Sequence, residues 1–545
     1  MSEGIVRPRL LDVAVLTLIA LFARVAAGLI VSWPPYTDPG YYTLVAERLA
    51  DGFGFTVPVL WSFLEVGGSI PSDPTLPVAS NGHWQPLTSI VAAGSMAIFG
   101  SDYRAGQVPM ILLSTALVPA TYLIGIWFWQ SRFVAVVAAL LGVCAGPLLI
   151  MYPAIDNFAV FGVTGCAAIW LACLAVDARR PLWWLAGSGV AVGLATLARV
   201  DGLLLAIAPM TAWALIAARG GTWTWPRLLA LGAASLGAFV IVVAPWAIRN
   251  IAEFGAPLPS AGGHTLWITE YNEQFSVGRS PSVDSYLAWG IGPIVLSKLV
   301  AWAELVGRTA VLLGGIFVIP FVAGLWRERH RRELAPFLAY FVVMFAAMGL
   351  VFTFHAPKGA FYHSAPAWLP FAFPLAVAGV APAALAAGRF WRFLRRPQTH
   401  RFLMVAGLLG AVSLSLVGSA ILYQQWIASR DRELAAASFL SADGRSDDVI
   451  MYSDPASMAL TSGNPGIAGP FDGYPIQERI IRAYGVDWVV VTIRPGETTD
   501  PLGFWKGGRA RDANGVPATF LADEPAFEAA GVRIFRVLAG ADGGS

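Results

Sequence analysis

Long apolar runs alternate with short polar or basic segments along most of the chain. A helix needs about 20 mostly apolar residues to cross a bilayer. The pattern therefore predicts an α-helical polytopic membrane protein with roughly 11 transmembrane helices. These spans are Leu10–Val31, Ala105–Trp129, Phe133–Ile150, Phe158–Val176, Leu182–Ala198, Leu203–Ala218, Leu228–Ile248, Thr309–Leu325, Leu334–Phe354, Ala365–Ala387 and Phe402–Trp426.

Basic residues predict the orientation of these spans, because cytoplasmic loops are enriched in Lys and Arg. The strongest clusters are "RERHRR" (Arg327–Arg332) and "GRFWRFLRRPQTHR" (Gly388–Arg401). Both fall on the same side as the N-terminus only if the shorter apolar run Pro86–Gly100 does not cross. That run is therefore predicted to be a helix lying along the outer surface, with the N-terminus in the cytoplasm.

Three polar segments then face outward. A membrane domain of residues 1–427 is expected to carry a first outer loop at 32–104 and a second at 249–308. Residues 428–545 follow as a small extracytoplasmic α/β domain. In that domain "DDVIMYS", "VDWVVVTI" and "VRIFRVL" are predicted strands, and "PIQERIIRAYG" is a predicted amphipathic helix that ends at Gly485.

Composition agrees with a membrane protein. Hydrophobic residues make up 57% of the 545-residue chain and charged residues only 13%, whereas soluble proteins need about a quarter of their residues charged. The 21 tryptophans suit a protein with two membrane interfaces. The first apolar run is too long for a signal peptide and is expected to be retained. A net charge of +2 gives no reason to expect a nucleic-acid partner.

Candidate chemistry gathers at the predicted outer face. Asp38 follows the first span, Asp156 ends the third, Arg249 ends the seventh and Lys358 follows the ninth. No phosphate-binding glycine loop, no ligand set at zinc spacing and no acidic cluster around Asp38 is evident in the sequence. Functional groups from separate loops on a rigid scaffold are typical of a binding or catalytic site.

Each of these residues also has a purely structural interpretation. Asp38-Pro39 is a favourable helix start, with Asp as the cap and Pro at the first helical position, and Asp156 is placed to cap the next span. Arg249 and Lys358 suit interfacial anchors with their stems in lipid. Arg199 is placed to pair with Asp201 in a tight turn.

Several segments together resemble the GT-C membrane glycosyltransferases, closest to the bacterial members of the protein O-mannosyltransferase and aminoarabinose-transferase branch. An Asp precedes a Tyr-rich helix and "LADGFGF", and then "HWQPLTSIVAAGSMAIFG" follows. Further matching segments are "GVAVGLATLARVDGLLLAIAP", "VVAPWAIRNIAEFGAPLPS" and "GAFYHSAPAWLPFAFPLAVAG". The resemblance covers most of the chain from Leu10 to about Ala387.

The resemblance implies transfer of a sugar, with inversion, from a polyprenyl-phosphate carrier to an acceptor hydroxyl of a glycan, lipid or protein outside the plasma (inner) membrane. Asp38 corresponds to the catalytic base and Asp156 to a second acidic position. Pro39 and Gln85 stand where the family often has Glu and Lys, so the phosphate contact is expected elsewhere. No metal ligand is assigned, and a divalent cation stays an open alternative. The candidate substrate-binding residues are Tyr41, Tyr42, His83, Arg199, Arg249, His264, Lys358, Tyr362 and His363.

Other functions remain open on the sequence alone. The segment "GGHTLWITEYNEQF" in the second outer loop is interpreted as a cover over the donor, hinged at its paired glycines. The main alternative is a transporter or flippase, but transporters place charged groups near the bilayer midplane and often have repeated halves. A lipid-linked oligosaccharide ligase and a non-catalytic sensor are further alternatives. Most charges here collect at one face, which favours the transferase.

Overall fold

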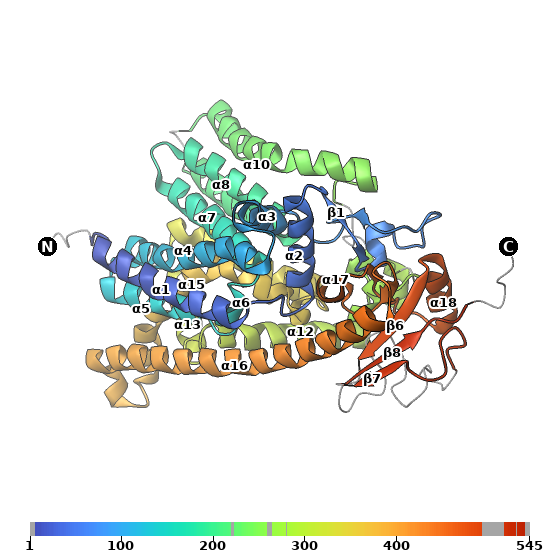
Figure 1. The fold of residues 1–545 in the computed structure, drawn as a ribbon. Coiled ribbons are helices and arrows are strands. Elements are labelled where there is room, and N and C mark those ends of the chain that lie inside the picture. The colour runs from blue at the N-terminus through green and yellow to red at the C-terminus, as the bar shows by residue number, and fades with distance from the viewer. Residues whose placement is uncertain are drawn as a thin grey trace.

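A computed structural model describes residues 6–219, 223–258, 264–279, 281–492, 517–529 and 531–539. Within these residues, nine helical segments are long and apolar enough to cross a membrane. Most of them run side by side, with the N-terminus at one end of the molecule and the C-terminus at the other (Figure 1). Their bounds are α1 Leu10–Ile30, α4 Tyr103–Trp129, α7 Asn157–Asp177, α8 Pro181–Ala198, η2 with α9 Val200–Ala217, α10 Trp225–Phe254, α14 with its flanking turns Arg332–Val351, α15 Ala360–Ala387 and α16 Pro397–Asp443.

The other two predicted spans, Phe133–Ile150 and Thr309–Leu325, are interrupted. The first is divided into α5 (Arg132–Cys144) and α6 (Leu148–Met151), and the second into α12 (Ile291–Leu312) and α13 (Val318–Glu328). Residues with positive φ stop the helices, namely Ala145 and Gly146 in the first and Gly314 and Gly315 in the second. A Cβ added to Gly146 would lie 2.9 Å from the carbonyl oxygen of Val311 in α12, so the two interrupted helices are packed closely there.

Helix α12 corrects the prediction for the second outer loop, because it begins at Ile291 rather than near Arg308. Lys298, Glu304 and Arg308 hide its apolar character in the sequence. The structure exposes Ile291, Val295 and Leu299 at successive helical turns, which is the pattern of a face turned toward lipid. The rest of the described part of this loop holds only short elements: η3 His264–Leu266, η4 Tyr271–Phe275 and α11 Val283–Ala288.

The first outer loop is folded against the membrane helices. It contains α2 (Thr37–Ala50), η1 (Phe63–Val66), α3 (Leu87–Phe99) and a short antiparallel pair, β1 (Thr56–Val57) with β3 (Val78–Ala79). Figure 1 shows α3 almost end-on beside the long axis of α4, so α3 lies across the bundle direction. Its 13 residues are too few for a full crossing. This agrees with the prediction that the run Pro86–Gly100 does not span.

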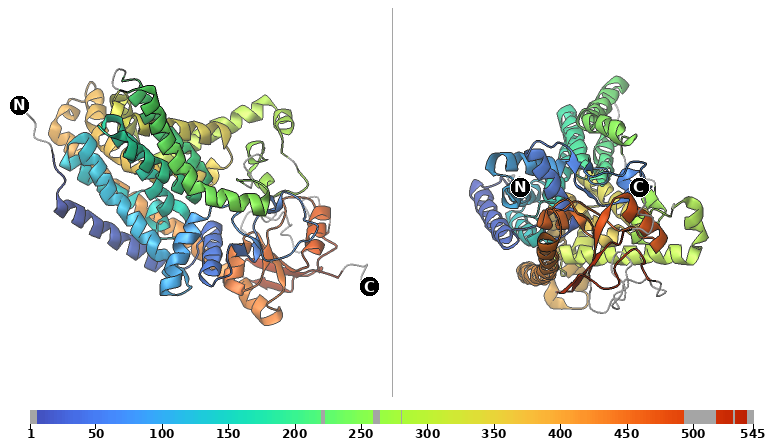
Figure 2. Two further views of the ribbon diagram at one scale, coloured as in Figure 1. Left: turned by 90° about the horizontal axis from the view of Figure 1, so that it is seen from above. Right: turned by 45° about the vertical axis from the view of Figure 1, so that its right-hand side comes forward.

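A mixed sheet forms the end of the molecule that carries the C-terminus (Figures 1 and 2). Its strand order is β2-β5-β4-β6-β8-β7, and α17 (Pro455–Ser462) and α18 (Tyr474–Ala483) accompany it. The three predicted strands and the predicted helix are all present as β4, β6, β8 and α18. The bounds are β2 Val59–Leu60, β4 Val449–Met451, β5 Gly466–Ile467, β6 Val486–Thr492, β7 Phe527–Ala529 and β8 Val532–Arg536.

Two features join this sheet to the membrane helices. Strand β2 comes from the first outer loop and pairs in parallel with β5. Helix α16 runs without interruption from Pro397 to Asp443, so the boundary expected at residues 427 and 428 lies inside a single helix. The two parts are therefore connected both by hydrogen bonds and by a continuous backbone.

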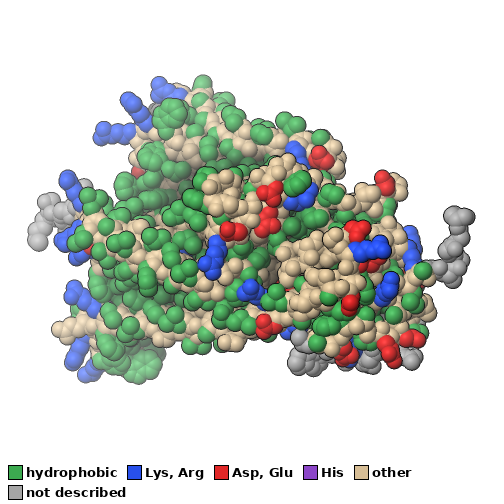
Figure 3. Space-filling view, in the orientation of Figure 1, with side chains coloured by type: hydrophobic (Ala, Val, Ile, Leu, Met, Phe, Trp, Pro, Cys, Tyr) green, Lys and Arg blue, Asp and Glu red, His purple; other side chains and the backbone are tan. Residues whose placement is uncertain are grey.

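Side chains are segregated along the long axis of the molecule. In Figure 3, the end that carries the N-terminus shows Lys and Arg with few acidic side chains, apolar side chains cover much of the middle, and acidic and basic side chains stand together toward the sheet. Large apolar residues are widely exposed on the membrane helices, among them Ile241 in α10 and Leu409 in α16. Such extensive apolar exposure is expected of a surface covered by lipid.

Helix α17 of the C-terminal part packs directly on α2, and Gly40 makes this contact possible. A Cβ at Gly40 would lie 2.8 Å from Ser457 Oγ and 3.3 Å from the Ser457 backbone nitrogen. The hydroxyl is held by a 2.8 Å hydrogen bond to Asp454, so it does not turn away freely. We expect Gly40→Ala to destabilise the protein by about 1–3 kcal/mol through overpacking, measured as thermal unfolding of the full chain in detergent.

Gly94→Ala is a matched control, because Gly94 lies in helix α3 with no atom within 4 Å of an added Cβ. We expect it to be neutral or stabilising by up to about 1 kcal/mol, since Ala is the better helix former. Equal behaviour of the two variants would contradict the close packing of α2 and α17.

Candidate functional site

Asp38 lies in the first turn of α2, near the positive end of the helix dipole. The helix begins at Thr37, its N-cap residue is Tyr36, and no side chain caps it. The prediction that Asp38 caps the helix is therefore wrong. Pro39 at the third helical position has no N–H to be capped, and the Asp38 side chain keeps 26% of its surface exposed. The carboxylate is thus left free for other contacts.

Asp156 is the N-cap residue of α7, as predicted. Its Oδ1 accepts a 2.6 Å hydrogen bond from the backbone N–H of Asn157, and its Oδ2 accepts a 2.7 Å bond from the Tyr36 hydroxyl. The side chain is completely buried. Asp156 therefore has both the structural role and a position beside Asp38.

His363, in the first turn of α15, connects the two carboxylates. Its Nε2 lies 3.6 Å from Asp38 Oδ2, and its Nδ1 lies 3.6 Å from Asp156 Oδ1. The ring stacks on Phe158 with centroids 4.2 Å apart and planes 7° from parallel. Its Nδ1 is also 2.8 Å from Asn157 Oδ1. The imidazole is therefore fixed on both its face and its edge.

Asn157 sets the tautomer of this histidine. The Asn157 Nδ2 donates a 3.1 Å hydrogen bond to the Tyr42 hydroxyl, which leaves Oδ1 to accept from the Nδ1–H of His363. The opposite nitrogen, Nε2, then presents a lone pair toward Asp38. Two electron-pair donors thus face each other across 3.6 Å, an arrangement that a proton or a cation between them would stabilise.

Small residues allow α7 and α15 to bring these groups together. A Cβ added to Gly162 would lie 2.7 Å from the Cβ of Pro366, and one added to Gly165 would lie 2.5 Å from the Cβ of Ala367. Larger side chains would therefore separate the helices. The close approach places Asp156 and Asn157, at the start of α7, next to His363 at the start of α15.

The two carboxyl groups have different pKa values, because their surroundings differ. Burial, opposed by the positive charge of Arg199 and reinforced by the negative charge of Asp454, raises the pKa of Asp38 to about 6. Burial, and then the charge of Asp38, raises the pKa of Asp156 further above its usual range. Two neighbouring carboxylates do not ionise together easily. The more exposed Asp38 therefore ionises first and is the better placed to accept a proton near neutral pH.

Arg199 is the main positive charge near this group. The predicted pairing with Asp201 is confirmed, with Nε 2.8 Å from Oδ1. Asp201 also accepts a hydrogen bond from the Ser364 hydroxyl of α15. The guanidinium is thus anchored to the helix that carries His363, and its charge is felt by both Asp38 and Asp156.

Asp38, Asp156 and His363 could also hold a metal ion. One ligand atom from each lies within 4.8 Å of the others. Two carboxylate oxygens and one imidazole nitrogen form a donor set suited to Mn²⁺, Zn²⁺ or Mg²⁺, and the inward lone pair of His363 fits such an ion. The expectation that Asp38 lacks an acidic neighbour is therefore wrong, because Asp156 is distant only in sequence.

The predicted aromatic residues of α2 are buried. The Tyr42 hydroxyl contacts Asn157, whereas the Tyr41 hydroxyl donates to Glu65 at 3.3 Å and accepts from the Asn81 N–H at 2.8 Å. His83 packs on Trp61 with ring centroids 4.8 Å apart, and burial lowers its pKa to about 3. These buried side chains therefore belong to the packing around the site.

The other predicted residues whose side chains are described contact groups other than the two carboxylates. The Arg249 guanidinium is 4.8 Å from the Trp246 ring centroid and bonds the Phe55 carbonyl at 3.3 Å. Lys358 Nζ is 5.5 Å from the ring centroid of Tyr271, and the Tyr362 ring lies under Arg308. The His264 side chain and the paired glycines at 262 and 263 lie outside the described residues, so the predicted hinge stays a prediction.

Three contributors were missed from the sequence. Asn157 orients His363, and Trp84 gives Asp38 a hydrogen bond. Asp454, the N-cap of α17, acts on Asp38 from the C-terminal part of the chain. Its Asp-Pro pair is the same helix-start signal that drew attention to Asp38-Pro39, but nothing local indicates its distant neighbour.

No family model matches the chain, and no curated protein matches it in sequence. Solved structures do. ArnT from Cupriavidus metallidurans bound to undecaprenyl phosphate aligns over 98% of this chain and 99% of its own, with 14% identity and a TM-score of 0.54. The archaeal oligosaccharyltransferase AglB from Archaeoglobus fulgidus, in complex with an inhibitory peptide and a dolichol-phosphate, aligns over 89% of this chain and 69% of its own, with 13% identity and a TM-score of 0.54.

A second structure of the Archaeoglobus fulgidus oligosaccharyltransferase, in complex with Zn and sulfate, aligns over 88% of this chain and 68% of its own, with 14% identity and a TM-score of 0.52. At these identities the similarity concerns the fold. The chain has the fold of GT-C membrane glycosyltransferases, as the sequence resemblance predicted.

Proposed function

We propose that the protein transfers a sugar from a polyprenyl-phosphate carrier to a hydroxyl of a glycan, lipid or protein acceptor at the outer face of the plasma (inner) membrane. The observation that carries this proposal is the group formed by Asp38, Asp156 and His363 on a GT-C fold. The polyprenyl phosphate and dolichol-phosphate in the similar structures support a lipid-linked donor. The basic end of the molecule supports a cytoplasmic N-terminus (Figure 3).

In this proposal Asp38 is the general base. As the acceptor oxygen forms its bond to the anomeric carbon, the hydroxyl proton passes to the Asp38 carboxylate, and the bond from that carbon to the phosphate oxygen breaks. Polyprenyl phosphate leaves with the bonding electrons, and a single displacement inverts the anomeric centre. Asp38 then returns its proton to water. The choice of Asp38 rather than Asp156 as the base is supported by exposure, since Asp38 is partly exposed and Asp156 is completely buried.

Positive charge is needed where the phosphate leaves, because a leaving anion is stabilised strongly in a site that excludes water. Arg199 is shared with Asp201, so its net effect is reduced. Lys358 forms no ion pair with any residue in the described ranges, and its ammonium is held over Tyr271. We infer that Lys358 is the main contact for the phosphate and that Arg199 has a supporting role.

A divalent cation held by Asp38, Asp156 and His363 is part of the proposal. When bound, such an ion supplies positive charge that stabilises developing negative charge on oxygen. The protein residues would orient the ion through the contacts already described: Asn157 fixes the His363 ring, and Tyr36 and the Asn157 N–H fix Asp156. Zn in one of the similar structures supports testing for a metal.

The experiment that tests this function compares lipid extracts and cell-envelope glycans, by mass spectrometry, with and without the gene. Loss of the enzyme is expected to accumulate one sugar-linked polyprenyl phosphate and to remove one decoration. The purified protein should then convert that lipid to free polyprenyl phosphate in the presence of the acceptor. Movement of the lipid between leaflets without cleavage would instead indicate a flippase.

The pH dependence should report on Asp38 and on its neighbour Asp454. A base must be ionised, so turnover in the absence of a divalent cation is expected to fall as the pH drops through the pKa of Asp38, which is about 6. Asp454→Asn removes a negative charge that raises this pKa and keeps a good N-cap for α17. We therefore expect its acidic limb to move to lower pH, measured as turnover at saturating donor.

Glu524→Gln is the control for that experiment, because Glu524 is exposed on the C-terminal part of the chain. Its profile should match that of the wild type. An Asp454→Asn limb that stays in place, or moves to higher pH, would show that Asp454 does not act on the base.

A further inference from the structure

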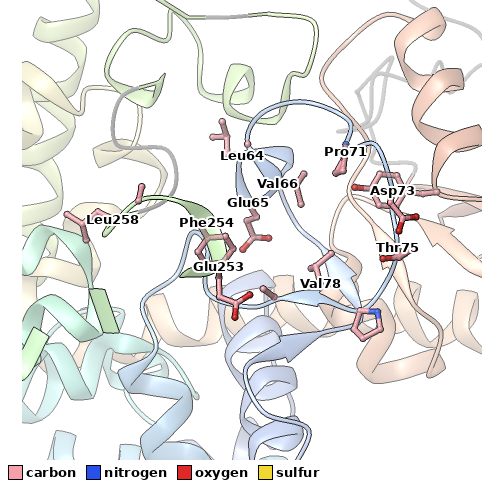
Figure 4. A pocket seen from close by; sticks show the side chains of 15 residues that line it. Leu64, Glu65, Val66, Pro71, Asp73, Thr75, Val78, Glu253, Phe254 and Leu258 are labelled. Carbon is pink, nitrogen blue, oxygen red and sulfur yellow. The ribbon is translucent and has the colours of Figure 1, made fainter. Parts of the chain in front are cut away.

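A cavity of about 640 Å³ lies outside the group of Asp38, Asp156 and His363. Its walls come from the first outer loop, from the C-terminal end of α10 and from Tyr484 just before β6. Figure 4 shows Glu65, Glu253 and Phe254 on one side of it, and Asp73 and Thr75 on the other. Its size is within the range of pockets that bind small ligands or single segments of larger ones.

The charged side chains described in the wall of the cavity are all acidic. Among the residues that the structure describes, the lining includes Glu65, Asp73 and Glu253 but no Lys, Arg or His. Carboxylates accept hydrogen bonds from hydroxyl and ammonium groups and repel phosphate, sulfate and carboxylate groups. The lining thus selects for a neutral or positively charged ligand that is rich in donors.

Two buried polar atoms of this wall lack partners among the residues that the structure describes. They are Oε2 of Glu65, whose residue is 5% exposed, and the hydroxyl oxygen of Tyr484, whose residue is 6% exposed. Figure 4 shows the Glu65 side chain between Phe254 and Val78, in the wall of the cavity. A buried polar group without a partner costs free energy, so a ligand that supplies donors would satisfy what the fold leaves open.

The cavity is connected to the reaction site through a short series of contacts. Glu65 accepts a hydrogen bond from Tyr41, which lies one helical turn from Asp38 on α2. The Tyr41 ring lies 4.2 Å from the Trp84 ring, and Trp84 gives Asp38 a hydrogen bond. Tyr41 and Trp84 therefore lie between the cavity and Asp38, and a chain-like ligand in the cavity would be separated from the base by these two residues.

We propose that this cavity is the recognition subsite for the acceptor and that it takes an uncharged or amino-substituted saccharide segment. Hydroxyl and ammonium groups supply donors to Glu65, Asp73 and Glu253, and the half-buried ring of Phe254 offers an apolar face for a sugar ring. The inference rests on the proposed glycosyl transfer, since it identifies the class of acceptor for that reaction.

The test is binding of three trisaccharides to the full-length protein in nanodiscs, without donor, by isothermal titration calorimetry. The probes are N-acetylated chitotriose, its deacetylated cationic form and trigalacturonate. The first two are expected to bind and trigalacturonate is not. Glu65→Gln and Glu253→Gln should each weaken the cationic probe about tenfold or more. The triple variant that also carries Asp73→Asn should lose the discrimination against trigalacturonate.

Glu253 is exposed, so Glu253→Gln keeps the test valid if substitution of the buried Glu65 disturbs folding. Glu524→Gln is the matched control and should bind like the wild type. Equal binding of trigalacturonate, no effect of either variant, or binding of a Lys-rich peptide but neither saccharide would overturn the proposal. Asp38→Asn should keep saccharide binding, so a protein that binds the probes but transfers no sugar would contradict the proposed function and leave this subsite intact.

Discussion

Asp38→Asn is expected to lower sugar transfer by about 10²–10⁴-fold, the range for losing a general base. Asn has the same shape but accepts no proton from the acceptor hydroxyl. The affinity for donor should change little, because the phosphate is assigned to Lys358 and Arg199 and not to Asp38. The measurement is turnover and KM of a purified polyprenyl-phosphate sugar by the protein in nanodiscs.

Asp51→Asn is the control on the same helix. Asp51 ends α2, is exposed, and accepts a hydrogen bond from Ser101. We expect this variant to retain nearly wild-type turnover. If Asp38→Asn were as active as Asp51→Asn, Asp38 would not be the base, and the proposed mechanism would be wrong.

His363→Ala is expected to have the second largest effect, a loss of about 10–100-fold in turnover, typical of residues that orient the reacting group or a metal ligand. His363 lies within 4 Å of both site carboxylates. Its removal leaves Asp38 without its imidazole partner. If a divalent cation occupies the site, the same variant should also bind less Mn²⁺, measured by electron paramagnetic resonance.

His400→Ala serves as the control, since His400 bonds the Leu394 carbonyl at the opposite end of the molecule. Thermal unfolding of both variants separates a loss of folding from a loss of function. A His363→Ala protein that unfolds like the wild type, turns over like the wild type and binds Mn²⁺ equally would remove His363 from the site.

Local sequence was sufficient for most of the helices and for three strands of the tail, β4, β6 and β8, but not for the short strands β5 and β7. Apolar runs of membrane length and the Asp156 cap are short-range features, so they can be read without knowledge of the fold. The errors are local too. Gly314 and Gly315 interrupt a predicted span because two residues with positive φ cannot continue a helix. In α12, the charged residues Lys298, Glu304 and Arg308 interrupt the apolar run, so the first part of this helix was not predicted.

The candidate site depends on contacts between residues that are far apart in the chain. His363 meets Asn157 across 206 positions, and Asp454 acts on Asp38 of α2 from the C-terminal part. The sequence indicated Asp38, Asp156 and His363 separately, as polar residues expected at one face. It did not show that they form a single group, nor that Tyr41 faces Glu65 instead of the reacting centre.

The sequence by itself determined that this chain is a membrane protein with a C-terminal α/β part, because hydropathy and helix length are properties of each segment alone. Only the tertiary structure decided which polar groups meet. Close packing of α7 on α15 at Gly162 and Gly165, and of α2 on α17 at Gly40, sets the distances between the carboxylates and the imidazole. Those distances arise from the fit of whole helix surfaces, which no single segment encodes.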